Sequence, residues 1–297
     1  MHVYNVTFTQ AVAEKIAQNF NGYFLKCRTL LFCSILQCYS LPQRRAKMDV
    51  TDESYLHMYN AYRNRDDFKE VFASLLNTLG REVCLVSVKS GLILGPGEGL
   101  CEIGFMQKCA ANIRKLTAVE QDHKSAEQLR HHFRKSLPNV EARVIESDFC
   151  TWNGLHDPVD LVVMFHMLYY CRPDERKQLV KKVYDGWLAA DGFVVVMSAS
   201  YTKRGNATGI FDRLGAPLLM WEDVEADFLE VGFVKRHVYE IQVTRDFSNP
   251  DEQFLRFYQT HAELPLTLNE VREAIKQLYP NGKADPSFNT LVVFQRA

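Results

Sequence analysis

The stretch that decides the fold is Gly91-Leu92-Ile93-Leu94-Gly95-Pro96-Gly97-Glu98-Gly99. Its first four residues predict a buried strand, and the glycines that follow precede an apolar window over residues 100–111. Glycine lets the backbone turn tightly and approach a ligand without a Cβ atom in the way. A helix that begins after such a loop offers its free N–H groups to the same ligand. We therefore expect Gly95, Gly97 and Gly99 to bind a ligand, although a glycine-rich stretch alone can also be a simple turn.

Apolar runs and helical windows alternate on both sides of this loop. Strands are expected at 115–120, 140–145, 159–164 and 193–197, with 83–88 as another strand or the leading part of the first, and helices at 52–79, 125–135 and 173–188. This alternation predicts a parallel sheet with helices on both faces. A helix at 222–231 and a strand at 233–243 follow, then two helices, the second opened by the capping box 267–270, and a last strand at 288–295. The seven strands predict a mostly parallel α/β sheet that ends in an antiparallel pair.

The charge balance excludes several classes of partner. The chain has 35 Lys and Arg residues against 36 Asp and Glu residues. A protein that binds a nucleic-acid backbone normally has a clearly basic surface, so we expect no nucleic-acid partner. A small neutral or zwitterionic molecule fits this balance better. We expect a monomer that acts on a small molecule.

Cysteine and histidine patterns give no sign of a metal or of a disulfide framework. The eight cysteines form no CxxC pair and the nine histidines form no HExxH motif. We therefore expect free thiols, a cytoplasmic location and no metal site. The apolar stretch 27–36 is far shorter than the ~20 residues of a membrane span, so we expect no membrane partner.

Residues 1–47 are expected to be an extension outside the fold, disordered or upstream of an alternative start at Met48. The remaining 48–297 would form one domain. Within it, we assign 48–80 to helices that cover the substrate, 81–200 to the cofactor-binding half, and 201–297 to substrate-side helices and the last two strands.

Two acidic positions indicate which cofactor the glycine loop binds. Glu120 ends the second strand, where a carboxylate accepts hydrogen bonds from ribose hydroxyls in doubly wound folds. NAD-dependent enzymes share that feature. However, Pro96 and Glu98 depart from the pyrophosphate pattern GxGxxG, and Asp148-Phe149 follows the third strand where methyltransferases hold and stack adenine. The pattern favours S-adenosylmethionine over NAD. We also expect Phe165, directly after the fourth strand, to contact this cofactor.

From about Ser54 to its end, the chain resembles the histamine N-methyltransferase family. The most specific similarity is Met167-Leu168-Tyr169-Tyr170 after the fourth strand, and the ending Phe288-Asn289-Thr290-Leu291 is similar to the family's terminal strand. Residues 210–215 resemble, more loosely, its substrate-side lid helix. The resemblance implies a Rossmann-like class I methyltransferase with helical substrate-binding additions, acting on a small amine.

The resemblance also implies roles for individual residues. Tyr170 matches an aromatic wall of the amine pocket, Asn289 a polar residue that orients the substrate, and Phe211 an aromatic that covers it. Tyr55 and Tyr59 lie in a segment whose aromatics cover the substrate. We assign Tyr170 and Asn289, with His166, to the catalytic set.

Two positions depart from the family pattern. His166 stands where the family has a Gln that contacts the substrate. The family also draws a substrate-binding carboxylate from its N-terminal helices, for which Asp66, Asp67 and Glu70 are all candidates here. These departures leave the choice of amine open.

Each of these residues has a structural alternative. His166 could be a core histidine, Tyr55 and Tyr59 could be core packing, and Asp66-Asp67 could be a solvated helix face. The protein could likewise methylate a nitrogen or oxygen of another small metabolite, or be a cofactor-binding module without activity.

The assignment of residues 1–47 predicts that a chain starting at Met48 folds and keeps full activity. The reason is that the polar stretch 42–47 separates the extension from the first helical pattern. Soluble yield and methyl-transfer rate, compared with those of the full chain, measure this. Loss of soluble expression would mean that the extension is a structural element.

Overall fold

The computed structural model describes residues 52–83, 85–200, 206–216, 219, 221–283 and 287–297. All of these residues belong to one compact unit. The expected extension over residues 1–47 lies outside the described residues. Within the described part of the chain, no helix is both long and apolar enough to span a bilayer.

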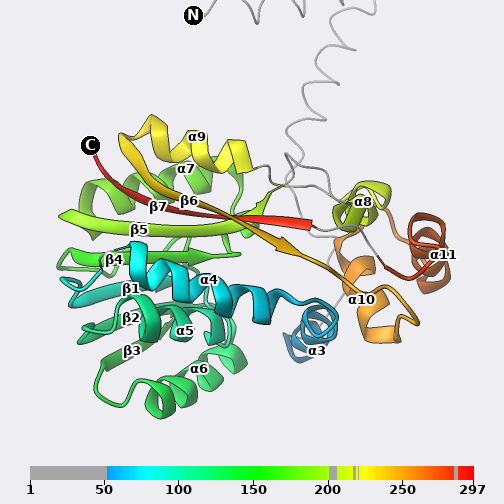
Figure 1. Cartoon of the computed structure of the whole chain (residues 1–297), viewed down its shortest axis with the longest axis horizontal. Helices are drawn as coiled ribbons and strands as arrows, with labels where there is room; N and C mark the ends of the chain where they lie inside the picture. Colours follow the sequence, from blue (N-terminus) through cyan, green and yellow to red (C-terminus); the bar gives the residue numbers. More distant parts are fainter. Residues whose placement is uncertain (1–51, 84, 201–205, 217–218, 220, 284–286) are drawn as a thin grey trace, which may run out of the picture. The chain divides into compact units, whose positions relative to one another are not determined.

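A seven-stranded sheet with the order β3-β2-β1-β4-β5-β7-β6 forms the centre of the domain (Figure 1). Its strands are β1 (Ser90–Leu94), β2 (Lys115–Glu120), β3 (Glu141–Glu146), β4 (Val159–Phe165), β5 (Leu188–Ser200), β6 (Phe233–Val243) and β7 (Ser287–Arg296). Strands β1 to β5 pair in parallel, whereas β7 is antiparallel to both β5 and β6. The predicted α/β fold, mostly parallel with an antiparallel end, is confirmed.

Helices cover both faces of the sheet, as Figure 1 shows. One layer consists of α4 (Phe68–Glu82), α5 (Leu100–Cys109) and α6 (His123–Ser136), and the other of α7 (Pro173–Lys182) and α9 (Trp221–Glu230). Side chains of β4 alternate between the two resulting cores. Leu161, Val163 and Phe165 join the core under α4 to α6, whereas Val162 and Met164 join the core under α7 and α9. A strand that is apolar on both faces is therefore buried on both faces.

Two expected elements differ from the structure. Residues 85–88 form no strand; Leu85 and Val88 are instead buried in the core beside α4, so their apolar character reflects burial alone. The helix expected over 173–188 is α-helical only to Lys182. A π-helical turn, Val183–Trp187, follows, and Leu188 already pairs with Val159 of β4.

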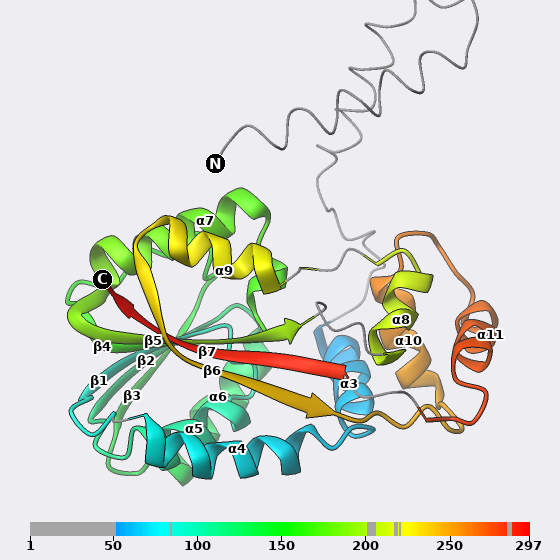
Figure 2. The same cartoon turned by 45° about the horizontal axis from the view of Figure 1, so that its top comes forward.

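Further helices form a third core beyond the carboxyl ends of the strands (Figure 2). They are α3 (Asp52–Arg63), α8 (Asn206–Arg213), α10 (Glu252–His261) and α11 (Leu268–Leu278). The expected capping box of α11 is present, since the Thr267 hydroxyl accepts from the Glu270 N–H and the Glu270 carboxylate accepts from the Thr267 N–H. Tyr62 of α3 stacks on Phe257 of α10, with ring centroids 4.1 Å apart.

A buried carboxylate joins α3, α4 and the end of β6. The Asp66 side chain is 1% exposed and accepts from Arg245 Nη2 at 2.6 Å and from Arg63 Nη1 at 3.3 Å. The two guanidinium groups also cover aromatic rings, Arg63 that of Phe68 and Arg245 that of Tyr62. The interpretation of Asp66 as part of a solvated helix face is therefore wrong, because its carboxylate is buried and paired. The sequence does not reveal this pairing, since Arg245 lies 179 residues away.

We expect Asp66→Asn to lower the free energy of unfolding by about 3–5 kcal/mol, since it leaves two buried guanidinium groups without their carboxylate. Urea unfolding at neutral pH measures the change. Asp67→Asn is the matched control, because Asp67 is exposed and mainly accepts one backbone hydrogen bond from Thr244. Equal losses in the two variants would contradict the role given to Asp66.

Candidate cofactor and substrate site

The predicted site residues gather where the strand order reverses. The chain runs outward from β1 to β2 and β3, and then returns to place β4 on the other side of β1. Ligands of such sheets bind in the crevice outside the carboxyl ends of the strands at this switch point. The glycine loop follows β1, Glu120 ends β2, Asp148 follows β3 and His166 follows β4.

The glycine loop has a backbone that requires glycine. Gly95, Gly97 and Gly99 all have positive φ, and the Gly95 N–H donates to the Val119 carbonyl at 2.9 Å. A Cβ atom on Gly99 would overlap the Leu129 side chain of α6. A Cβ atom on Gly97 would meet no atom within 4 Å, so the loop is open on that side. A ligand can therefore approach the backbone at Gly97.

The Glu120 carboxylate holds this loop against β2. Oε2 accepts from the Gly97 N–H at 2.7 Å and Oε1 from the Asp122 N–H at 2.9 Å. The residue is 6% exposed, and burial raises its pKa against the opposing effect of these backbone hydrogen bonds. Each carboxylate oxygen can accept a second hydrogen bond. The geometry thus fits a carboxylate that also binds a ribose hydroxyl pair.

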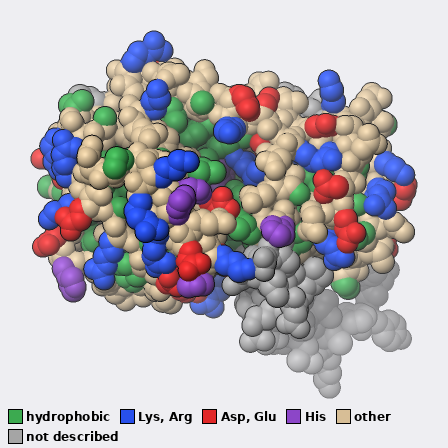
Figure 3. Space-filling model, turned by 90° about the horizontal axis from the view of Figure 1, so that it is seen from below, with side chains coloured by type: hydrophobic (Ala, Val, Ile, Leu, Met, Phe, Trp, Pro, Cys, Tyr) green, Lys and Arg blue, Asp and Glu red, His purple; other side chains and the backbone are tan. Residues whose placement is uncertain are grey.

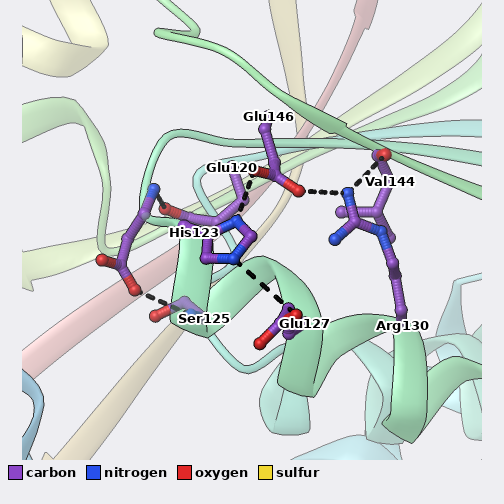
Figure 4. Close-up of polar contacts among 8 residues, drawn as sticks. Glu120, His123, Ser125, Glu127, Arg130, Val144 and Glu146 are labelled. Atoms are coloured by element: carbon purple, nitrogen blue, oxygen red, sulfur yellow. Dashed lines mark hydrogen bonds and ion pairs between the residues drawn. The ribbon is translucent and has the colours of Figure 1, made fainter. Parts of the chain in front are cut away.

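The other charged groups in Figure 4 form a separate, structural network. Glu146 at the end of β3 accepts from Arg130 at 2.6 Å and lies 2.7 Å from the imidazole of His123. The hydrogen bond to Glu146 raises the pKa of His123, and the same bond lowers the pKa of Glu146. Asp122 caps α6 by accepting from the Ser125 N–H. Glu146 is therefore engaged by side chains of α6.

Three further residues assigned to the cofactor have different surroundings. Asp148 is exposed and bonds the Cys150 N–H at 2.9 Å, which leaves acceptor capacity on its carboxylate. Phe149 is 3% exposed and packs beneath Gly95, so its ring supports the loop from the core. Phe165 is also 3% exposed and contacts the rings of Phe72 and Phe105. Both rings are thus buried in the core, and their contacts with the cofactor stay a prediction.

His166 has a strained backbone and an imidazole in a positively charged environment. Its φ is 51°, its N–H donates to the Met197 carbonyl, and its ring meets Phe68 edge-on at 5.6 Å. Burial, followed by the charges of Arg63 and Arg245, lowers the pKa of His166 to about 3. The ring is therefore neutral at physiological pH. Its buried Nε2 has no hydrogen-bond partner among the described residues.

Aromatic side chains from α3, the segment after β4, α8 and α10 meet in a second group of site candidates. The Tyr55 and Tyr170 hydroxyls lie 2.9 Å apart, and Tyr55 stacks on Tyr59 with ring centroids 6.5 Å apart. Phe211 of α8 and Phe257 of α10 complete the cluster, their centroids 6.5 Å apart. The structure thus brings together the four aromatic residues assigned to the substrate. We call them, with Phe257 and His261, the aromatic cluster.

Sequence patterns did not reveal several members of this region. Phe257 and His261 occupy one face of α10, four residues apart, a spacing that indicates only an amphipathic helix. His261 Nδ1 lies 2.7 Å from the Phe257 carbonyl, and its ring lies 6.0 Å from that of Phe211.

Asn289, which the sequence analysis assigned to the catalytic set, lies on β7 and is 8% exposed. It pairs with Ala199 of β5, two residues beyond the Met197 whose carbonyl accepts from the His166 N–H.

The candidate carboxylates from the N-terminal helices line a different cavity. This groove has a volume of about 1110 Å³, lies between α3 and the segment after β6, and includes Asp66, Asp67 and Glu70. None of the residues assigned to the cofactor or the aromatic cluster lines it. On the face drawn in Figure 3, positive and negative side chains are interspersed, consistent with a net charge of −1.

Comparisons with known proteins agree with this geometry. Residues 92–192 match the sequence profile of the family described as "Methyltransferase domain". The sequence matches none of the curated proteins. The structure is similar to a putative methyltransferase from Bacillus halodurans C-125, with 13% identity and a TM-score of 0.55 over 74% of this chain and 98% of that one. It is also similar to the YcgJ protein from Bacillus subtilis (12% identity, TM-score 0.52, 77% and 99% covered).

A third similar structure holds a cofactor product: the N-methyltransferase NodS from Bradyrhizobium japonicum WM9 in complex with S-adenosyl-L-homocysteine (16% identity, TM-score 0.50, 82% and 99% covered). At these identities the structures share the fold. The profile match spans β1 to the start of β5, which includes the glycine loop, Glu120 and His166. The domain therefore has the Rossmann-like fold of class I methyltransferases, and residues 92–192 match a methyltransferase domain.

Proposed function

We propose that the protein transfers the methyl group of S-adenosylmethionine to a small amine, of the histamine-like or another biogenic type. The observation that carries this proposal is the aromatic cluster, which includes Tyr170 of the segment that follows β4 and His166. Aromatic faces pack favourably against flat aromatic amines, such as those that carry an imidazole ring. The Tyr55 and Tyr170 hydroxyls add polar groups that can orient one.

The cofactor supplies a methyl group bound to a positively charged sulfur. In this proposal, the backbone at Gly95, Gly97 and Gly99 lets it approach the sheet, and Glu120 accepts from its ribose hydroxyls. Asp148 provides a second carboxylate at the same edge. Methyl transfer needs nucleophile, methyl carbon and sulfur in line, so holding the substrate is the main task of the protein. Orientation can contribute up to roughly 7–11 kcal/mol.

The charge of the site favours an amine without its proton, which is the nucleophilic form. Around His166, the two guanidinium groups of Arg63 and Arg245 face the single carboxylate of Asp66. Burial raises the pKa of the nearby Glu102 to about 8, so this carboxyl group is mostly neutral at pH 7. A surplus of positive charge lowers the pKa of a bound amine. In this proposal, the unpartnered His166 Nε2 shares a hydrogen bond with the neutral amine.

The fold itself does not select the atom that is methylated. Similar structures include NodS, described as an N-methyltransferase, and MmcR, described as mitomycin 7-O-methyltransferase, with a TM-score of 0.50. The acceptor must therefore be inferred from the pocket. The surplus positive charge also predicts that an amine with a carboxylate binds better than the same amine without one.

Product masses from a panel of biogenic amines, each incubated with the full chain and cofactor, test the proposal. Histamine and histidine are a matched pair, because they differ only in the carboxylate. A phenol and a catechol of similar size are the oxygen-acceptor controls. Methylation of the phenol or catechol alone would replace the amine with an oxygen acceptor, and no cofactor binding by calorimetry would indicate a domain without activity.

We expect Glu120→Ala to weaken cofactor binding by about 1.5–3 kcal/mol, because it removes hydrogen bonds to a charged group. Calorimetric titration with S-adenosylmethionine measures the Kd. Glu146→Gln serves as the control, since that carboxylate ends the adjacent strand but is engaged by His123 and Arg130. An unchanged Kd in Glu120→Ala would mean that another residue binds the ribose hydroxyls, Asp122 being the nearest candidate.

We expect His166→Gln to change KM and amine selectivity, towards histamine, with cofactor Kd and kcat little altered. With a pKa of about 3, the His166 imidazole is a weak base and a poor acceptor of the amine proton, and Gln preserves hydrogen-bonding capacity. A fall in kcat of about 10²–10⁴-fold would instead indicate a general base. Steady-state kinetics with the active amines measure both outcomes.

The same substitution has a signature in stability. The pKa of His166 is about 3 in the folded chain and near 6.5 when unfolded, so below pH 6.5 the unfolded chain binds the proton first. The wild type should therefore lose stability relative to His166→Gln as the pH falls from 7 to 5, by up to about 1.4 kcal/mol per unit. An equal change of unfolding free energy with pH in the two proteins would contradict this. If His166→Gln lost stability while its kinetics stayed unchanged, His166 would be a core residue.

A further inference from the structure

Two thiols from different loops of the site lie against each other. Cys150 follows β3, two residues after Asp148, and Cys171 follows Tyr170 in the loop after β4. Their Sγ atoms are 3.0 Å apart, although 21 residues separate them in the sequence. We propose that Cys150 and Cys171 are an oxidisable pair, which a peroxide converts into an intramolecular disulfide that displaces Asp148 and weakens cofactor binding.

The two thiols differ in solvent exposure, and this difference determines which of them reacts with peroxide first. Cys150 is half-buried, whereas Cys171 is 3% exposed within the core under α7. The hydrogen bond with Cys150, followed by burial, raises the pKa of Cys171 well above its ordinary value. Cys150 is therefore the thiol that a peroxide meets first.

The chemistry balances with peroxide as the only co-reactant. The Cys150 thiolate attacks one peroxide oxygen, the O–O bond breaks, and a sulfenic acid and hydroxide form. The Cys171 thiol then attacks the sulfenic sulfur, so that the S–S bond forms, the S–O bond breaks and water leaves. In sum, two thiols and one peroxide give one disulfide and two waters, with two electrons passing from sulfur to oxygen. A dithiol reductant reverses the reaction.

The effect on the site follows from the contacts of each cysteine. A disulfide brings the sulfur atoms to about 2.05 Å, so they must move together by about 1 Å. Cys171 is fixed in the core, and the movement therefore falls on the loop of Cys150. The Cys150 N–H bonds Asp148 Oδ1 at 2.9 Å, so this loop carries the Asp148 carboxylate with it. This step rests on the proposed role of Asp148 at the cofactor, whereas formation of the disulfide does not.

The test treats the folded, reduced full chain with equimolar hydrogen peroxide and maps disulfides in unreduced peptides by mass spectrometry. We expect a Cys150–Cys171 link that dithiothreitol removes, in the wild type and in the control Cys101→Ser, which changes another half-buried thiol. The link should be missing in Cys150→Ser and in Cys171→Ala. Calorimetry should show a Kd for S-adenosylmethionine about 3–10-fold higher in the oxidised wild type, and no change in treated Cys150→Ser.

Each of the other outcomes overturns one part of the proposal. A link between other cysteines, or sulfinic acid at Cys150 without a link, overturns the pair. A Cys150–Cys171 link with an unchanged Kd overturns the coupling to Asp148. If the reduced protein binds no cofactor, the proposed function fails while the peptide map still decides on the pair. If Cys171→Ala does not fold, the comparison of wild type with Cys150→Ser is sufficient.

Discussion

The hydrogen bonds of the Glu120 carboxylate are the constraint on which the rest of the site depends. They tie the N–H of Gly97, after β1, to the end of β2. A buried carboxylate is stable only when its oxygens accept hydrogen bonds, and the glycine loop supplies one because its backbone takes a left-handed turn there. The carboxyl ends of the parallel strands are then open to a ligand at the switch point between β1 and β4. The cofactor site is thus a direct consequence of the sheet order.

A second buried carboxylate, Asp66, joins the helical additions to this sheet. It compensates one of two buried guanidinium groups and leaves a surplus positive charge near His166. Burial and this surplus together lower the pKa of His166 and keep its ring neutral. In the proposed function, the same surplus disfavours a protonated amine. Asp66, for which the sequence allowed a position on a solvated helix face, is therefore one of the buried groups that set the charge near His166. Asp66 pairs with the two guanidinium groups and is not a member of the aromatic cluster. The carboxylate that the histamine N-methyltransferase family draws from its N-terminal helices therefore has no equivalent in that cluster.

The resemblance to that family led to the right class of enzyme and to a consistent set of aromatic residues. It gives no firm basis for histamine as the substrate, since His166 replaces the expected Gln. In the proposed function, the choice of substrate depends on the aromatic cluster and on the charges near it. Several of these residues, including Phe257, His261 and Arg245, come from segments in which the sequence shows only an amphipathic helix or the end of a strand.

The sequence by itself determined the features that depend on neighbouring residues. The glycine loop, Glu120 at a strand end and the capping box of α11 all follow from short-range rules on backbone conformation and hydrogen bonding, and the alternation of strands and helices follows from hydrophobic periodicity. Only the tertiary structure decided which distant residues meet: Asp66 with Arg245, Tyr55 with Tyr170, and Cys150 with Cys171. The same side chain can be solvated on a surface or paired in a core, because its environment depends on packing between elements far apart in the chain. For the same reason, Phe149 and Phe165 were placed correctly at strand ends, while their burial in the core was not predictable.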